Sequence, residues 1–371
     1  MNFRKTILAV SLSACTGAAM AADKTPTLGE VLKASGLTVN GYIDYSYNDL
    51  STDFAAYRQY DTERRGFNLQ MLDLSVGYQP SSGFGGFVEL NYGSDAQVNT
   101  FAATNGSNVE SIDAQQAYIQ YATGPLTLMA GKFDTIAGAE VIQAPNNTNF
   151  SRSLLFFTEP AFHTGLRAVY TASDALKFTA GVNNGWNVNK KSYKTPAASG
   201  LPPTGNTLEL GVSATPAKIL SLSAAYYTGQ ETGVTDAGTR SLLDLVATLN
   251  ATDALSFVLS YDNGKQEHGT ATGGDAKWDG IAGYANYKFS DMWRMSLRTE
   301  KLKDKDGFIT ALGTAQTLKE TTLTVGYAPV SSLELRAEYR KDKSDQNVFT
   351  ENGVTDKKTQ NSLALEAVYK F

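Results

Sequence analysis

The sequence has few of the residues on which most catalytic and metal sites depend. Its 371 residues include one cysteine and two histidines, His163 and His268. Because Cys15 lies in an N-terminal segment that we expect to be removed, the mature chain can form neither a disulfide framework nor a thiolate metal site. There is also no G-x-S-x-G elbow and no P-loop. We therefore expect no enzyme active site, no metal centre and no cofactor.

Long apolar runs and an excess of positive charge are also missing. Beyond the N-terminus, no stretch reaches the roughly 18 uninterrupted apolar residues that a transmembrane helix needs. The net charge of −5 argues against a nucleic-acid partner, because such partners favour basic surfaces. Glycine (33) and tyrosine (19) are, in contrast, abundant.

The N-terminus has the three parts of a secretory signal peptide. A basic start, MNFRK, precedes the apolar run ILAVSLSACTGAAM and the small-residue sequence AMA. We predict that residues 1–21 are removed after Ala21. The sequence Leu12-Ser13-Ala14-Cys15 also resembles a lipoprotein cleavage box, which would leave a lipidated Cys15 instead. Residues 22–36 form a short periplasmic segment in which LGEVLKASG predicts one or two helical turns.

From residue 37 to the end, apolar and polar residues alternate with a period of two, as in β-strands that separate two environments. In LTVNGYIDYSYN (37–48), for example, Ile43 and Tyr45 share one face, and Asp44 and Ser46 the other. Residues 67–74 depart from this alternation, which suggests a register switch or bulge. The pattern predicts sixteen strands near 37–48, 67–78, 85–92, 111–121, 125–133, 164–171, 175–183, 207–215, 219–227, 241–250, 254–261, 280–289, 292–300, 320–327, 332–340 and 361–371.

The connections between these strands alternate strictly in length. Short ones such as QPSSGF, TGP and ATD follow every second strand, and long ones lie between them. This asymmetry is typical of outer-membrane proteins. We predict an all-β fold: a transmembrane antiparallel up-and-down β-barrel of about 16 strands spanning 37–371, in the outer membrane of a Gram-negative cell. Its turns would be periplasmic and its long loops extracellular.

Aromatic residues gather near both ends of the predicted strands, as in the two aromatic girdles of membrane barrels. Tyr78 and Tyr327, for example, end strands that lead to short turns, and Tyr92 and Tyr261 end strands that lead to long loops. The chain itself stops at Phe371. A C-terminal aromatic residue resembles the signal by which the outer-membrane insertion machinery recognises its clients.

Charged residues occupy the face of the strands that would point inward. Because burying them in a dry core would be very costly, we expect a water-filled lumen. Four arginines on the thirteenth and fifteenth strands face Glu300, Glu334 and Glu338, which would create a transverse field that favours dipolar solutes without strong ion preference. The predicted pore wall comprises Arg167, Arg294, Arg298, Glu334, Arg336, Glu338 and Arg340.

The third long connection, residues 134–163, is the longest and does not alternate. In sixteen-strand porins the third loop typically folds inward, and Leu154, Leu155, Phe156 and Phe157 would then pack on the inner wall. The charged side chains would form an electrostatic filter. A loop that merely caps the barrel mouth is the alternative. The predicted constriction comprises Asp134, Glu140, Arg152, Glu159 and His163.

Three segments resemble one known family, the OmpL-like β-barrel porins of Gram-negative bacteria. They are GKFDTIAGAEVIQAPNNTNFSRSLLFFTEPAFHTGLR (131–167), GVNNGW (181–186) and LGEVLKASGLTVNGYIDYSY (28–47). The resemblance covers essentially the whole mature chain, and it implies an outer-membrane channel without specifying the solute.

The predicted function is therefore passive diffusion of small hydrophilic solutes or ions. A substrate-selective channel remains an alternative, as do a surface receptor or adhesin and an enzyme at the barrel rim that uses His163. Expected partners are these solutes, outer-membrane lipid and the insertion machinery. A homotrimer is possible, since porins of this size are often trimers.

Overall fold

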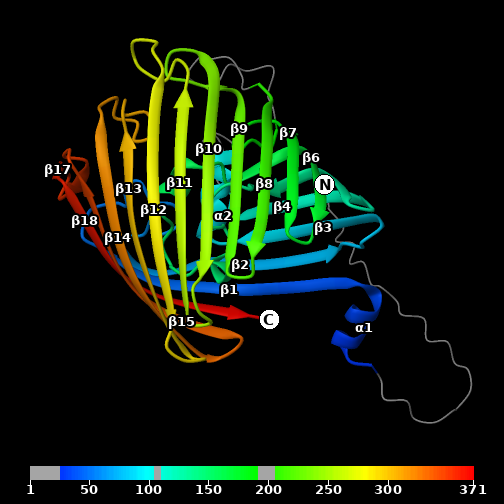
Figure 1. Ribbon diagram of the computed structural model, residues 1–371. Helices are drawn as coiled ribbons and strands as arrows, with labels where there is room; N and C mark the ends of the chain where they lie inside the picture. Colours follow the sequence, from blue (N-terminus) through cyan, green and yellow to red (C-terminus); the bar gives the residue numbers. More distant parts are fainter. Residues whose placement is uncertain (1–25, 104–109, 191–204) are drawn as a thin grey trace, which may run out of the picture.

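Sixteen strands form a closed barrel in the computed structural model, which describes residues 26–103, 110–190 and 205–371 (Figure 1). The predicted signal peptide and Cys15 lie outside these ranges. The barrel strands are β1 Leu37–Leu50, β2 Arg65–Tyr78, β3 Gly83–Tyr92, β4 Ile112–Thr123, β5 Leu126–Asp134, β6 Phe162–Ser173, β7 Leu176–Asn183, β8 Thr207–Ala217, β9 Leu220–Thr232, β10 Ala237–Asn250, β11 Leu255–Gln266, β12 Ala276–Lys288, β13 Trp293–Asp304, β14 Gln316–Val330, β15 Leu333–Ser344 and β18 Thr359–Lys370.

Each barrel strand pairs antiparallel with its neighbours in the sequence, and the first strand pairs with the last. In that closing ladder Tyr42 lies opposite Lys370 and Leu50 opposite Ser362. Because the barrel is closed, no strand edge in it has unpaired amides. A barrel surrounded by lipid requires such closure. The predicted fold class and the sixteen predicted strands are thus confirmed.

The strands extend further on the long-loop side than the alternation predicted. β9 continues to Thr232, β11 to Gln266 and β13 to Asp304. The hydrogen-bonded ladder there runs past the aromatic residues, where the outer face no longer needs apolar side chains. The sequence pattern therefore fades before the strand does. Figure 1 shows the long loops gathered at one end of the barrel and the short turns at the other.

The two faces of the strands have opposite chemistry. On β1, Ile43 and Tyr45 are 39% and 45% exposed, whereas Asp44 and Ser46 are 2% and 1% exposed. This arrangement is the reverse of a soluble protein, in which large apolar side chains are buried and charges are exposed. An apolar outer surface around a polar interior is the organisation of a membrane barrel.

The irregularity predicted within residues 67–74 is a bulge in β2. Asp44 pairs with Met71 and Tyr45 with Leu69, so Gln70 is an additional residue. Gln70 and Met71 are both buried, at 1% and 0% exposure. The bulge thus shifts the alternation of inward and outward side chains by one residue. After Met71 the alternation is regular again up to Tyr78.

Short elements outside the barrel ladder complete the fold. Helix α1, Leu28–Ser35, begins with a capping box between Thr27 and Glu30 and ends at Gly36 in the left-handed conformation. It lies beside the start of β1 (Figure 1). The long connections contain α2, Ser94–Ala103, and the hairpin β16 Phe349–Glu351 and β17 Val354–Lys357. Among the described residues, no helix is long and apolar enough to cross a membrane.

Candidate functional site

The third loop, residues 135–161 between β5 and β6, contains two helical turns: η1 Ala144–Asn146 and α3 Leu154–Thr158. Ser153 begins α3 by accepting a hydrogen bond from the Phe156 N–H at 3.0 Å. Helix α3 ends at Glu159, and Pro160 prevents its continuation. Its contacts are with the inward-facing side chains of the barrel, so the loop lies against the inner wall.

Carboxylates of the wall accept hydrogen bonds from backbone N–H groups of this loop. Glu338 on β15 accepts from Phe150 at 2.8 Å and from Ser151 at 3.0 Å. Glu300 on β13 accepts from Leu154 with both oxygens at 2.8 Å. Charge-assisted hydrogen bonds of this kind are among the strongest in proteins. They fix the start of α3 against strands that lie far away in the sequence.

Four arginines of the wall donate to carbonyl groups of the same loop. Arg294, which is partly exposed, donates to the Thr148 carbonyl at 2.6 Å, and the other three are buried. Arg298 donates to the Ser151 carbonyl at 2.7 Å, and Arg336 donates to the Ala144 carbonyl at 3.3 Å. Arg340 donates to the Arg152 carbonyl. Each of these three arginines also pairs with a buried carboxylate: Arg298 with Glu140 and Glu320, Arg336 with Glu366, and Arg340 with Asp342. Their charges are therefore largely compensated within the wall and the loop.

Arg152 of the predicted constriction is 2% exposed. Its guanidinium donates to three carbonyls of its own loop: Val141 at 2.9 Å, Phe150 at 2.8 Å and Ile142 at 2.7 Å. The side chain therefore organises the loop internally. Glu140 has a similar position, because it accepts from the Ser153 N–H at 2.6 Å and pairs with Arg298.

Apolar side chains of α3 pack on the wall as three separate contacts. Leu154 joins a cluster with Trp278, Leu302 and Leu318. Leu155 packs with Ala282 and Tyr284, and Phe156 with Tyr42 and Met71. Phe157 is less buried, and its ring is 6.4 Å from that of Tyr57.

His163 is not at the barrel rim but in strand β6. It is completely buried, and its ring stacks on Tyr227 with centroids 4.8 Å apart. Its Nδ1 lies 3.2 Å from the Gly185 carbonyl. A histidine sealed in this way offers no accessible base, so this position gives no support to a rim enzyme built on His163.

Two further residues of the predicted wall, Arg167 and Glu334, also form ion pairs. Arg167 on β6 donates to Glu209 at 2.6 and 2.9 Å, and its guanidinium lies 3.9 Å from the centre of the Phe133 ring. Glu334 pairs with Arg294 and with Arg336. Of the predicted wall, only Arg294 and Glu334 retain appreciable exposure.

A cavity of about 490 Å³ is lined by strands β1–β5, the end of β18 and the part of the third loop around Gln143. Asp73, Glu89 and Asp134 line it, together with Gln143 of the loop. Gln143 donates to Glu89 and to Asp134, both at 2.8 Å. At the short-turn end its lining includes Asn40, Lys370 and Phe371. Among the predicted constriction residues, only Asp134 lines this cavity.

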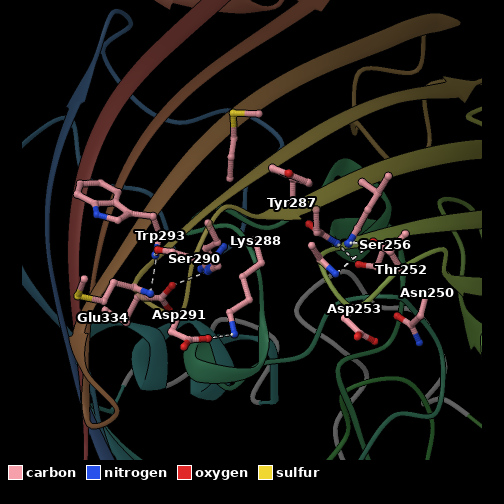
Figure 2. Close-up of a pocket in the computed structure, with 17 residues that line it drawn as sticks. Asn250, Thr252, Asp253, Ser256, Tyr287, Lys288, Ser290, Asp291, Trp293 and Glu334 are labelled. Atoms are coloured by element: carbon pink, nitrogen blue, oxygen red, sulfur yellow. Dashed lines mark hydrogen bonds and ion pairs between the residues drawn. The ribbon is translucent and has the colours of Figure 1, made fainter.

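A second, smaller cavity of about 250 Å³ lies at the short-turn end, near β11–β13 (Figure 2). Figure 2 shows Lys288 pointing toward Asp291, with which it pairs at 2.8 Å. Arg294 and Glu334 belong to the same lining. Positive and negative charges are balanced more evenly here than in the larger cavity, which has three carboxylates against Lys370 and is called the acidic cavity below.

Among the described residues, buried acidic side chains far outnumber buried basic ones. Eighteen aspartates and glutamates are buried, against seven lysines and arginines: Arg58, Lys132, Arg152, Arg167, Arg298, Arg336 and Arg340. Alternation alone could not reveal Asp73, Glu89 and Gln143 as members of one site, since they come from β2, β3 and the third loop. For Asp73 and Glu89, the signal in the sequence was that both occupy inward-facing positions on neighbouring strands.

Comparison with known protein families gives one match, over residues 32–371, to the family described as "Putative beta-barrel porin-2, OmpL-like". The chain belongs to this family. The resemblance seen in the sequence is thereby confirmed. This OmpL-like porin is an outer-membrane channel protein that crosses the outer membrane of Gram-negative bacteria with its strands. No curated protein sequence matches the chain.

Solved structures similar to this porin include an outer-membrane channel, an outer-membrane protein and a porin. The DcaP channel of Acinetobacter baumannii has 16% identity and a TM-score of 0.63, covering 90% of this chain and 97% of DcaP. The trimer form of OmpT from Vibrio cholerae has 15% identity and a TM-score of 0.60, covering 90% and 99%. An anion-selective porin from Comamonas acidovorans has 14% identity and a TM-score of 0.60, again covering 90% and 99%. At these identities the similarity establishes the fold.

Proposed function

We propose that this porin lets small hydrophilic solutes diffuse passively through the outer membrane, past a constriction formed by the third loop. The observation that carries the proposal is the asymmetric position of that loop. Glu300, Glu338 and the arginines of β13 and β15 hold it against one wall. The polar cavity of about 490 Å³ lies beside the loop, along the inner faces of β1–β5. Solutes pass along strands β1–β5.

The passage prefers cations over anions. The arginines of the wall are engaged by carboxylates and loop carbonyls, whereas Asp73, Glu89 and Asp134 line the cavity. A water-filled passage with negatively charged side chains and low-dielectric walls concentrates cations and repels anions. This differs from the sequence-based expectation of a balanced transverse field. It also differs from the anion-selective porin of similar fold, because the fold does not fix the charge of the lining.

Single-channel recording of the detergent-folded protein in a planar bilayer tests both statements. We expect steady openings, and under a KCl gradient a reversal potential whose sign corresponds to cation preference. A well-folded barrel without conductance would contradict the porin proposal. Conductance with anion preference would contradict the assignment of the acidic cavity as the passage while leaving the channel itself intact.

Two partners complete the proposal. The chain assembles as a homotrimer, as the trimer form of OmpT does, and light scattering of the detergent complex measures this directly. Phe371, whose backbone pairs with Gly41 at the short-turn end, serves as the signal for the insertion machinery. Its replacement by alanine should reduce insertion in cells more than folding in detergent.

A further inference from the structure

Three carboxylates meet where the end of the third loop reaches the barrel wall. Glu159 ends α3, Asp244 lies on β10 and Asp262 on β11. One oxygen atom from each of the three lies within 4.8 Å of the others. Glu159 is 7% exposed, and both aspartates are 0% exposed. Water is therefore almost excluded from a group of three acidic side chains.

The backbone register forces two of these carboxylates together. Asp244 and Asp262 are direct partners in the β10–β11 ladder. Like charges directly opposite each other destabilise a sheet. The adjoining strands provide no compensating charge at this level, because Ala225 of β9 lies opposite Asp244 and Gly280 of β12 lies opposite Asp262.

A second observation concerns the oxygen atoms themselves. Both carboxylate oxygens of Asp244 and Oδ1 of Asp262 are buried and have no donor in good hydrogen-bond geometry in the described part of the chain. The Gly138 N–H interacts with Asp244 outside that geometry, and Oδ2 of Asp262 accepts from the Thr158 hydroxyl at 3.3 Å. Within that part, no ion pair includes any of the three carboxylates. Buried polar atoms are almost always satisfied, and buried charges are paired or bind a metal ion. The negative charge of these carboxylates must therefore be compensated, either by a bound cation or by protons.

We propose that Glu159, Asp244 and Asp262 bind one Ca²⁺ ion. Ca²⁺ takes about six to eight oxygen ligands in flexible geometry, and three carboxylates can supply up to six. Mg²⁺ fits less well because it keeps several of its waters, for which a site this buried has little room. The ion joins the end of α3 to β10 and β11. It fastens the third loop on the side away from Glu338 and Arg340, which hold its other part.

Calorimetric titration of the detergent-folded mature protein, stripped with EDTA, tests the site directly. With CaCl₂ we expect one ion bound per chain and with MgCl₂ much weaker binding. Asp244→Asn and Asp262→Asn should each weaken Ca²⁺ binding about tenfold or more, because each removes a charged ligand. Asp291→Asn is the matched control, since its side chain is 98% exposed in a short turn, and it should bind Ca²⁺ as the wild type does.

Thermal unfolding separates lost binding from lost folding. Ca²⁺ should raise the unfolding temperature of the wild type and not that of Asp244→Asn. In EDTA, Asp244→Asn should unfold at the same temperature as the wild type or higher, because it relieves repulsion. Wild-type protein that binds no Ca²⁺, or binds it no better than Asp244→Asn, would overturn the proposal. The charge of the three carboxylates would then be neutralised by protons. Neither readout depends on conductance, so the site and the channel function are tested separately.

Discussion

Oε2 of Glu338 accepts the backbone N–H of Phe150 at 2.8 Å, although 188 residues separate them in the chain. The other oxygen of the same carboxylate accepts the Ser151 N–H at 3.0 Å. One side chain thus fixes two amides of the third loop against β15. If this loop forms the constriction, the size and steadiness of the channel depend on Glu338.

Glu338→Ala should loosen the third loop. It leaves two buried N–H groups without an acceptor, at a cost of about 1–3 kcal/mol each. We expect a lower unfolding temperature and a larger, noisier single-channel conductance. Glu351→Ala is the control, because the Glu351 side chain is partly exposed and forms an exposed pair with Lys357 in the β16–β17 hairpin. Unchanged conductance in a destabilised Glu338→Ala protein would argue that the loop does not limit flow.

Glu89→Gln should reduce cation preference. Glu89 lines the acidic cavity and accepts from Gln143 and Gln116. Glutamine keeps the size of the side chain and removes its charge, so the reversal potential under a KCl gradient should move toward zero. Asp291→Asn, on an exposed turn, should leave the potential unchanged. Equal effects of the two substitutions would place the selectivity elsewhere.

Gly138→Ala should destabilise the end of the third loop. Gly138 has a φ of +89°, and a Cβ atom there would overlap the Glu159 carboxylate. A side chain in this conformation, displacing a buried charge, costs about 1–3 kcal/mol. Gly283→Ala is a suitable control, since a Cβ atom at Gly283 meets no atom within 4 Å. Thermal unfolding in detergent measures both. Identical unfolding temperatures would show that the loop adapts freely at Gly138.

The stability of the metal-free protein should depend on pH through Glu159. Burial, and next the charges of Asp262 and Asp244, raise the pKa of Glu159 well above its ordinary value of 4.5. A raised folded-state pKa favours folding below the unfolded value of about 4.5, and this contribution disappears as the pH rises through the folded pKa.

Unfolding temperatures of the wild type and Glu159→Gln in EDTA, measured from pH 4 upward, test this dependence. The wild type should lose stability relative to Glu159→Gln as the pH rises, and Ca²⁺ should restore it in the wild type alone. Parallel curves for the two proteins would show that Glu159 does not titrate in this way.

Residue patterns predicted the barrel well because the membrane imposes them locally. The alternation around Asp44 and the disruption near Gln70 are visible in the chain and reappear as an inward face and a bulge. Strand ends were less accurate, as at Gln266, because the ladder continues beyond the lipid. The third loop lies between β5 and β6, two strands that the alternation predicted. The partners of its side chains could not be deduced from the sequence, because they come from distant strands.

Sequence by itself determined the membrane barrel, its sixteen strands and the separation of its long loops from its short turns, since each follows from local alternation and from connection length. Only the tertiary structure decided which inward charges meet. Arg298 is compensated by Glu140 from another part of the chain, whereas Asp244 and Asp262 face each other with no counter-charge among the residues that the structure describes. Such pairings depend on strand register and on the path of the third loop. Both are set by contacts between residues far apart in the sequence.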